Sequence, residues 1–578
     1  MGTFGSFTTV RLGIYAAQKG LDVTGNNVTN INTPGYTRQR LNQVSLIPSV
    51  NDRYSSSYNA RVGQGAVIAG INQIRDVGLD ISYRKASSDV GSANTKLEGL
   101  GSLATILDEV GKGSLEQDDG VILSQLNDLR DLISKAIAGG VSTYDPLIRS
   151  SAEALTTFFH SYAEKLSGLK TTYEDKLTQQ VDYVNSLLNN IRDLNVSIRN
   201  ADIRGDPGLE LRDERNRLLD ELSQYVKVDV TYSMEDVGSG TMVEKLTVSL
   251  ATGDKNTLVD GEYVAQFSQD KELLARNDAY DPTLPVGPGN EPYLDVNGLP
   301  TSDPNAAKKI PNDNYSLVLG PLTDPRGLQQ SAGDFGANIG DTDLYGSLQS
   351  IRELLTEEGD FSSDADAVTD PDAAAKRGIP YYQKMLDSLA YEFATAMNKL
   401  NDTGLAGSGN LFSISSNTDD AEQVDASGNK ITINASNISV SKGWLNETTS
   451  IQATADPNAA SGDVSNLAKF LALFDEKQDF DPSDIVADAA GDSYQGTFED
   501  MLLKIQSTLA KDQMATDAVL NNYVITANDL YVDREGVMGV DLNDEATSLM
   551  TYQKAYTAAC RLLTVMEEAL DSLINGTV

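Results

Sequence analysis

Two apolar stripes with a heptad period lie at opposite ends of this 578-residue chain. In both stripes the positions recur at alternating spacings of three and four, which is typical of helices that pack by inserting knobs into holes. The N-terminal stripe consists of Phe7, Val10, Ile14, Ala17, Leu21, Thr24, Val28 and Ile31. The C-terminal stripe consists of Leu549, Tyr552, Tyr556, Ala559, Leu563, Met566, Leu570 and Leu573. Neither has a partner nearby in sequence, so we expect the two terminal helices to pack against each other, against copies of themselves, or both.

The period of the apolar pattern changes along the chain, and this predicts a multidomain α+β fold. Helical periods occur in residues 4–32, 94–225 and 378–402 and from 463 onward. Alternation by two begins near Val228 and returns within residues 411–460, which predicts half-buried antiparallel strands. We therefore predict a terminal α-helical coiled coil of paired N- and C-terminal helices, a long-helix bundle domain and inserted β-rich domains.

These changes of period predict four parts, the number expected for a chain of this length. A terminal coiled-coil assembly domain combines residues 1–45 and 535–578. A helical core domain with a short β-hairpin combines residues 46–227, 376–411 and 463–534. A β-rich inserted domain spans 228–375, and a second β-rich insertion spans 412–462. Nine of the 17 prolines lie between Pro282 and Pro325, which predicts a loop-heavy excursion or a poorly ordered insert.

Several boundaries follow from local signals. The sequence Thr33-Pro34-Gly35 ends the first helix, because proline cannot continue the ladder and Pro-Gly suits a type II turn. Glycine-punctuated apolar runs in residues 59–75 predict strands or a hairpin. A long helix is expected from about Pro146 to Asn200, followed by a break at Gly205–Gly208 and a shorter helix over residues 209–222.

The formal charge of −39 excludes two classes of partner. Nucleic acids and anionic membrane surfaces both attract clustered Lys and Arg, so we expect no nucleic acid and no membrane as partners. Residues 1–50 are the exception to this acidic character, because they contain four basic side chains and one acidic side chain, Asp22. Residues 541–578 hold two basic and six acidic side chains, so the two ends should attract each other weakly.

The chain offers little catalytic chemistry. His160 is the one histidine and lies in a helical stripe, where a structural role is the simpler interpretation. Cys560 is the one cysteine, so no disulfide forms within the chain, and a small packing residue is favoured over a nucleophile. We expect no cofactor, no metal and no enzymatic activity. No 18-residue apolar run and no Sec-type signal peptide occur, which predicts a cytosolic protein or export without a cleaved signal.

Four asparagines lie near the end of the first helix, although asparagine is a poor helix former. They are Asn26, Asn27, Asn30 and Asn32, followed by Thr33-Pro34-Gly35-Tyr36. One interpretation is a helix C-terminus whose carbonyls are satisfied by the amides. The other is a polar packing surface that needs side-chain amides at close range.

This segment closely resembles the N-terminal signature of bacterial flagellar axial proteins, the rod, hook and hook-associated proteins. The C-terminal residues resemble the closing helix of the same family, from Gly539-Val-Asp541-Leu542 through Leu549 and Tyr552-Gln553 to Leu573. Each match covers about forty residues and the pair is highly specific. Asp541 is the candidate N-cap of this helix, with Asp544 and Glu545 in its first turn.

Within the family the chain most resembles the hook-associated protein 1 subfamily. Its turn continues as Thr-Arg-Gln, and a long helical region precedes the β-domain, with Asp145-Pro-Leu-Ile-Arg149 and Arg212–Ser223 as landmarks. Met397–Gly404 resembles a loop that precedes the second insertion. The subfamily usually has a histidine where Asn401 stands, a departure that affects no chemistry.

The resemblance implies a structural protein of the bacterial flagellum at the junction between hook and filament. It implies export through the flagellar type III apparatus to an extracellular location. The implied partners are a homo-oligomeric ring of copies, hook protein, hook-associated protein 3 and a cytoplasmic export chaperone that binds the C-terminal helix. The alternatives are another axial role, as hook or distal rod protein, and remotely an enzyme housed in the β-rich insertion.

The two ends supply the residues expected to mediate assembly. They are Phe7, Val10, Ile14, Ala17, Leu21, Asn26, Asn27, Asn30, Asn32, Pro34, Gly35, Tyr36, Leu542, Leu549, Tyr552, Gln553, Tyr556, Leu563, Met566, Leu570 and Leu573. Each apolar side chain contributes roughly 1.5–3 kcal/mol when buried, but a lone helix pair covers only one side of each stripe. We therefore predict that the termini fray in the free monomer and become fully helical among neighbours.

Overall fold

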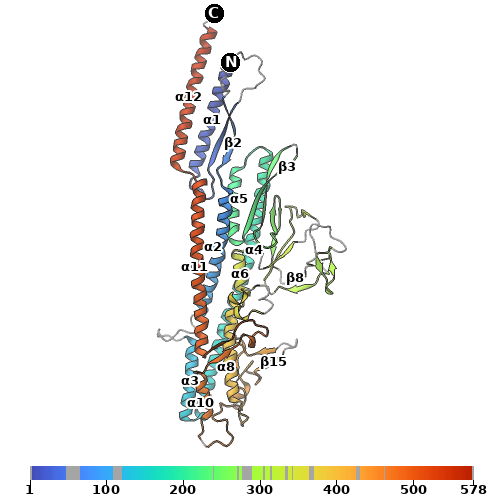
Figure 1. The fold of residues 1–578 in the computed structure, drawn as a ribbon, viewed down its shortest axis with the longest axis vertical. Helices are drawn as coiled ribbons and strands as arrows, with labels where there is room; N and C mark the ends of the chain where they lie inside the picture. Colours follow the sequence, from blue (N-terminus) through green and yellow to red (C-terminus); the bar gives the residue numbers. More distant parts are fainter. Residues whose placement is uncertain are drawn as a thin grey trace.

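A computed structural model gives the fold of most of the chain. The residues that it describes are 3–46, 65–107, 120–238, 240–269, 272–275, 277, 290–303, 306–312, 315–331, 336–340, 343–363, 370, 372–424, 430–460 and 462–575. The molecule is elongated, with both chain termini at one end and the last helices running along one side (Figure 1). It is helix-rich with small scattered sheets, a multidomain α+β protein.

Helices of very different lengths form the body of the molecule. They are α2 (Val77–Leu107), α3 (Val121–Gly139), α4 (Val141–Ile203), α5 (Leu209–Tyr225), α6 (Ser347–Thr356), α8 (Ile379–Asn401), α10 (Ser465–Leu473) and α11 (Phe498–Met538). Helix α11 lies along α2, and α4 packs against α3, α5 and α6. One continuous apolar core joins these helices to the inserted regions.

The terminal elements stand at one end of this body. Helix α1 (Thr3–Thr29) is followed by an antiparallel hairpin of β1 (Gln39–Ser45) and β2 (Ala66–Gln73). Helix α12 (Leu542–Asn575) follows α11 after a three-residue connection. Helices α1 and α12 lie side by side beyond the end of α11 (Figure 1).

The inserted regions hold short antiparallel strands. A four-stranded sheet has the order β3–β4–β5–β6, and its two long strands are β3 (Val228–Asp236) and β4 (Met242–Leu250). The expected alternation holds in β4, where Leu246, Val248 and Leu250 are buried beside α4. The remaining strands in the described residues are β5 (Thr257–Asp260), β6 (Tyr263–Val264), β7 (Phe267–Ser268), β8 (Glu272–Leu274), β9 (Tyr293–Leu294), β10 (Pro300–Thr301), β11 (Lys309–Pro311), β12 (Leu317–Leu319), β13 (Ala337–Ile339), β14 (Phe412–Ser413), β15 (Glu422–Val424), β16 (Lys430–Thr432), β17 (Ser439–Val440), β18 (Gln478–Phe480) and β19 (Tyr494–Gly496).

Helix boundaries largely follow the sequence signals. The long helix predicted from Pro146 is α4, which begins five residues earlier, because a proline near a helix start removes a single hydrogen bond. The break at Gly205–Gly208 is confirmed, and Gly208 has a left-handed φ of 53° before α5. The first helix ends at Thr29, three residues before the predicted end, and a turn occupies the asparagine-rich segment.

Four expectations need correction. The helical region predicted from residue 94 begins at Val77, because the small residues of α2 hide its period. The region from 463 onward is interrupted by the β18–β19 hairpin, whose three-residue strands are too short to show a period. Helix α6 was not anticipated. The hairpin predicted at 59–75 pairs β2 with an unpredicted β1, and residues 59–64 lie outside the described residues. Residues 282–289 of the proline-rich excursion also lie outside them, and its described part holds the short strands β9 to β12.

No helix among the described residues is both long enough and apolar enough to cross a bilayer.

Candidate assembly site

The terminal helices contact each other through small side chains. The buried face of α1 consists of Val10, Ala16, Ala17, Gly20, Val23, Thr24 and Asn27. A Cβ atom at Gly20 would lie 2.4 Å from Cδ1 of Tyr552, so this glycine lets the tyrosine ring lie directly on the α1 backbone. Helix α1 runs toward the joint with the body and α12 runs away from it, so the two helices are antiparallel.

The buried face lies beside the predicted N-terminal stripe rather than along its centre. Val10 and Ala17 are buried, whereas Phe7, Ile14 and Leu21 are half-buried on its flank. Sequence reasoning missed Ala16 and Gly20, and the glycine inside a helical pattern was the available signal for close approach.

Much of the predicted C-terminal stripe stays accessible in the single chain. Tyr552, Leu563, Met566 and Leu570 are half-buried, whereas Gln553 is exposed. The exposed apolar members are Leu549 (37%), Tyr556 (37%) and Leu573 (61%), and Leu542, which precedes the stripe, is 54% exposed. The outer side of α12 adds Met550, Leu562 and Val565, each more than half exposed. One chain therefore covers one side of α12 and leaves a long apolar side open.

The asparagines hold the segment that follows α1. The Asn27 side chain donates to the Gln39 carbonyl at 2.9 Å and accepts from the Gln39 N–H at 3.0 Å, as a neighbouring strand would. The Tyr36 hydroxyl donates to Asn27 Oδ1 at 2.8 Å, and the Asn26 amide donates to the Tyr36 hydroxyl at 3.3 Å. Asn30 donates to the Asn26 carbonyl, the helix-capping role. Asn30 therefore satisfies a carbonyl at the helix end, whereas Asn26 and Asn27 use their amides for close packing against the following segment.

The turn that ends α1 is accessible. The Tyr36 N–H donates to the Thr33 carbonyl at 3.2 Å, and Gly35 has φ of 78°, as a type II turn requires. Asn32, Pro34 and Gly35 are exposed. Burial raises the pKa of Tyr36, and the nearby Asp213 raises it further, so its hydroxyl stays a donor to Asn27.

An ion pair ties α12 to the segment after α1. Arg38 Nε donates to Glu545 Oε1 at 2.8 Å, and a second nitrogen of Arg38 reaches Asp544 at 3.3 Å. Glu545 is 3% exposed, which is uncommon for glutamate without a partner. The predicted N-cap is confirmed, because Asp541 Oδ1 accepts from the N–H groups of Asn543 at 2.7 Å and Asp544 at 3.3 Å.

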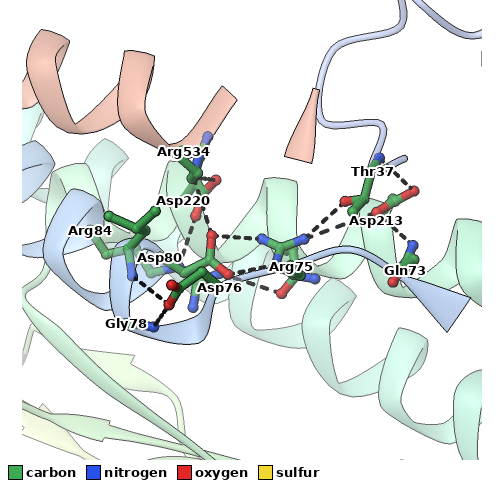
Figure 2. A network of polar contacts seen from close by, with 12 residues as sticks. Thr37, Gln73, Arg75, Asp76, Gly78, Asp80, Arg84, Asp213, Asp220 and Arg534 are labelled. Atoms are coloured by element: carbon green, nitrogen blue, oxygen red, sulfur yellow. Dashed lines mark hydrogen bonds and ion pairs between the residues drawn. The ribbon is translucent and has the colours of Figure 1, made fainter. Parts of the chain in front are cut away.

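A network of polar contacts joins the terminal elements to the body (Figure 2). Asp213 on α5 accepts from the Thr37 N–H at 3.2 Å and from the Gln73 amide at 2.8 Å. It therefore holds both the segment before β1 and the end of β2. Burial raises the Asp213 pKa to about 6, against the lowering effect of its hydrogen bonds from Thr37 and of the Arg75 charge.

The other contacts of this network join α2, α5 and α11 (Figure 2). Asp220 on α5 accepts from Arg84 of α2 at 2.8 Å and from Arg534 of α11 at 2.6 Å. Arg75 pairs with Asp80 at the start of α2. The Arg534 guanidinium also lies 4.1 Å from the ring centroid of Tyr83. The C-terminal end of α11 is thus held to α5 by an ion pair just before α12 begins.

Sequence reasoning identified the turn and the helices but missed this network. Its members come from four separated segments, and single charged residues carry no periodic signal. Arg38 was noted as a basic residue and Glu545 as a first-turn acid, yet their pairing depends on how α12 meets the β1 segment.

The catalytic alternatives gain no support from the geometry. His160 lies on α4 of the body and Cys560 on α12 of the terminal pair. The described residues contain no group of three His, Cys, Asp or Glu side chains that could hold a metal ion. A groove of about 1220 Å³ lies between α4, α8 and the inserted regions, and its lining mixes charges of both signs, including Lys170, Glu174, Lys384 and Asp387.

Three regions of the chain match known families. Residues 144–295 match the flagellar hook-associated protein FlgK helical domain. Residues 537–576 match the C-terminal region of flagellar basal body rod FlgEFG proteins, and residues 13–37 match the flagella basal body rod protein family. The last two matches coincide with α12 and with the second half of α1 and its turn.

Full-length relatives agree with these matches. The chain is 25% identical over 581 residues to flagellar hook-associated protein 1 of Bacillus subtilis, covering 99% of this chain and 98% of the relative. The chain thus resembles flagellar hook-associated protein 1 over its whole length. A relative of the same name from Salmonella typhimurium is 23% identical over 600 residues, covering 97% of this chain and 98% of the relative.

A solved structure shares the fold of this chain. It is described as the flagellar hook junction protein FlgK from Burkholderia pseudomallei, and it superposes with a TM-score of 0.50 at 12% identity. The match covers 79% of this chain and all of that chain. The relatives are named as hook-associated proteins, in keeping with a structural role.

Proposed function

We propose that this chain is a structural subunit of the bacterial flagellum at the junction between hook and filament. The observation that carries the proposal is the coincidence of its open apolar helix surface with the segments that match flagellar axial families. Full-length similarity to proteins named hook-associated protein 1 assigns the junction.

Assembly through the terminal helices follows from what one chain leaves open. The buried face of α1 consists mostly of small side chains and lets α12 pack closely against it. The side of α12 that faces away from α1 remains apolar and accessible. Packing such sides against neighbouring copies buries apolar area at about 25 cal/mol per Å². The heptad spacing supports a coiled-coil arrangement in the assembled state.

This proposal includes a gain of order on assembly. Helices α1 and α12 are each packed on one side only, so the local stability of the pair in the free chain is low. The two helices therefore fray until neighbouring subunits pack on them. Circular dichroism of the monomer should show little helix lost when residues 1–40 and 535–578 are removed. A loss equal to two intact helices would contradict it.

The proposed export route and binding partners are inferred from the similarity to flagellar hook-associated proteins. The chain is exported through the flagellar type III apparatus, with a chaperone held on the C-terminal helix, and forms a homo-oligomeric ring. Hook protein lies on one side of this ring and hook-associated protein 3 on the other. The four-part domain division and the outward position of the acidic inserted regions belong to the same proposal.

The deciding experiment is a helix-breaking substitution in a strain that lacks the native chain. Leu563→Pro should prevent incorporation while leaving the body folded, because proline removes a hydrogen bond in the interior of α12. Val296→Pro, at an exposed turn position of the inserted region, is the control and should leave filaments intact. Normal motility with Leu563→Pro would exclude assembly through α12.

A second candidate is another axial position, because residues 13–37 and 537–576 match rod families. The phenotype of a deletion separates the two. Loss of a junction protein leaves hooks without filaments, whereas loss of a hook or rod protein leaves no hooks.

A further inference from the structure

Helix α11 carries an apolar side that the body of the molecule does not cover. Residues Thr516, Leu520, Ala527, Leu530 and Arg534 face α2 and are at least half-buried. The opposite side forms a second heptad stripe of Met514, Ala518, Asn521, Ile525, Asn528 and Val532, all exposed. Met514 is 74%, Ile525 60% and Val532 64% exposed. We call these six residues the outer stripe of α11.

The outer stripe has features of a contact surface rather than of a solvated face. A helix that packs on one neighbour normally presents charged residues on its other side. Here apolar and asparagine side chains repeat at spacings of four and three over about 27 Å of helix. Asparagines at heptad positions fix register and partner choice at some expense of stability.

The charge beside the outer stripe is acidic. Asp517, Asp529, Asp533 and Glu535 are exposed around it. The single basic residue between Lys511 and Lys554 is Arg534, which is buried and paired with Asp220. A complementary surface must therefore combine apolar side chains with free basic ones.

The β1–β2 hairpin of this chain presents such a surface. Its exposed side holds the cross-strand pairs Arg40–Asn72 and Val44–Val67. Val44 is 53% and Val67 39% exposed. Arg40 has no ion-pair partner among the residues that the structure describes, and the first 50 residues are net positive in a chain of charge −39. We call these four residues the hairpin face.

We infer that the outer stripe of α11 binds the hairpin face of a second copy of this chain. The stripe lies below the joint and the hairpin above it in the same chain (Figure 1), so the contact joins two copies displaced along the long axis. Because the two surfaces differ, the contact is head-to-tail and generates a ring or a helical array. The inference rests on the proposed function and names the surfaces that link its subunits outside the terminal helices.

Site-specific cross-linking in assembled flagella tests this contact. In a Cys560→Ala background, Ile525→Cys in one chain is co-expressed with Val44→Cys or Val67→Cys in another and treated with a short bismaleimide. A covalent dimer of two different chains is expected. Ile525→Cys with Val296→Cys, an exposed residue of the inserted region, is the control and should give none.

Charge reversal provides the second arm. Arg40→Glu in the chain that carries the hairpin cysteine should lower the cross-linking yield about tenfold, and Asp529→Lys with Asp533→Lys in the chain that carries Ile525→Cys should restore it. If filaments form but Ile525→Cys joins neither hairpin position, or joins only itself or a protein of another mass, the inference is overturned while the proposed function stands. Hooks that bear filaments without the chain would instead contradict the proposed function.

Discussion

Arg38 and Glu545 are 507 residues apart in sequence, yet Arg38 Nε lies 2.8 Å from Glu545 Oε1, a carboxylate that is 3% exposed. Arg38→Ala leaves the buried carboxylate of Glu545 without its ion-pair partner. Breaking such a pair should reduce the local stability of α12 by about 3 kcal/mol, seen as faster amide hydrogen exchange through its first turns in the assembled protein.

Asp544→Asn is the matched control for this pair. Asp544 also contacts Arg38, at 3.3 Å, but its side chain is 65% exposed. An exposed ion pair contributes at most about 1 kcal/mol. Equal effects of the two substitutions would show that burial of Glu545 is not what holds the joint.

Two glycines of α1 should respond in opposite directions to alanine. Gly13→Ala meets no atom within 4 Å and should stabilise α1 by about 1 kcal/mol, the difference in helix propensity. Gly20→Ala places a methyl group 2.4 Å from the Tyr552 ring and should weaken the helix pair by about 1–3 kcal/mol despite the better propensity. Amide exchange in α1 of the assembled protein measures both, and faster exchange in Gly13→Ala would argue against this packing.

The start of α12 depends on its N-cap. Asp541→Ala removes the acceptor of two backbone N–H groups and should cost about 1 kcal/mol. Asn543→Ala keeps the cap and changes an exposed side chain, so its effect should be within about 0.5 kcal/mol. Helical content of the assembled protein and thermal unfolding of α12 report the difference.

Glu392 on α8 should make stability depend on pH near neutrality. Burial raises its pKa to about 7, with further raising by Asp484 and Asp479 and opposition from Lys399. The folded chain therefore binds this proton more tightly than the unfolded chain, and stability from this group rises as pH falls from about 8 toward 5. Denaturant unfolding of the body at several pH values should show this slope.

Glu392→Gln should flatten that slope and raise the unfolding free energy at pH 8, because the desolvated charge is gone. Glu568→Gln, on the exposed outer side of α12, is the control. A slope unchanged by Glu392→Gln would assign the pH dependence to other carboxylates, such as Asp387, whose pKa burial raises to about 6.

The sequence predicts elements better than it predicts how they meet. Periodicity located α4 and α8 within a few residues, and Pro34-Gly35 predicted the turn that the structure contains. It missed the β18–β19 hairpin, which is too short for a period to develop. It also missed α6, although Leu348, Ile351, Leu354 and Leu355 recur there at helical spacing. The network around Asp213 and Asp220 depends on tertiary contacts between distant segments, so no local sequence pattern predicts it.

The antiparallel pairing of α1 with α12 has a consequence for timing. Helix α12 is synthesised only after the helices of the body, so α1 has no helix partner during most of translation. A chain that stops before Tyr552 presents α1 without the ring that lies on Gly20. Under the proposed assembly through the paired helices, we expect such incomplete chains not to be incorporated.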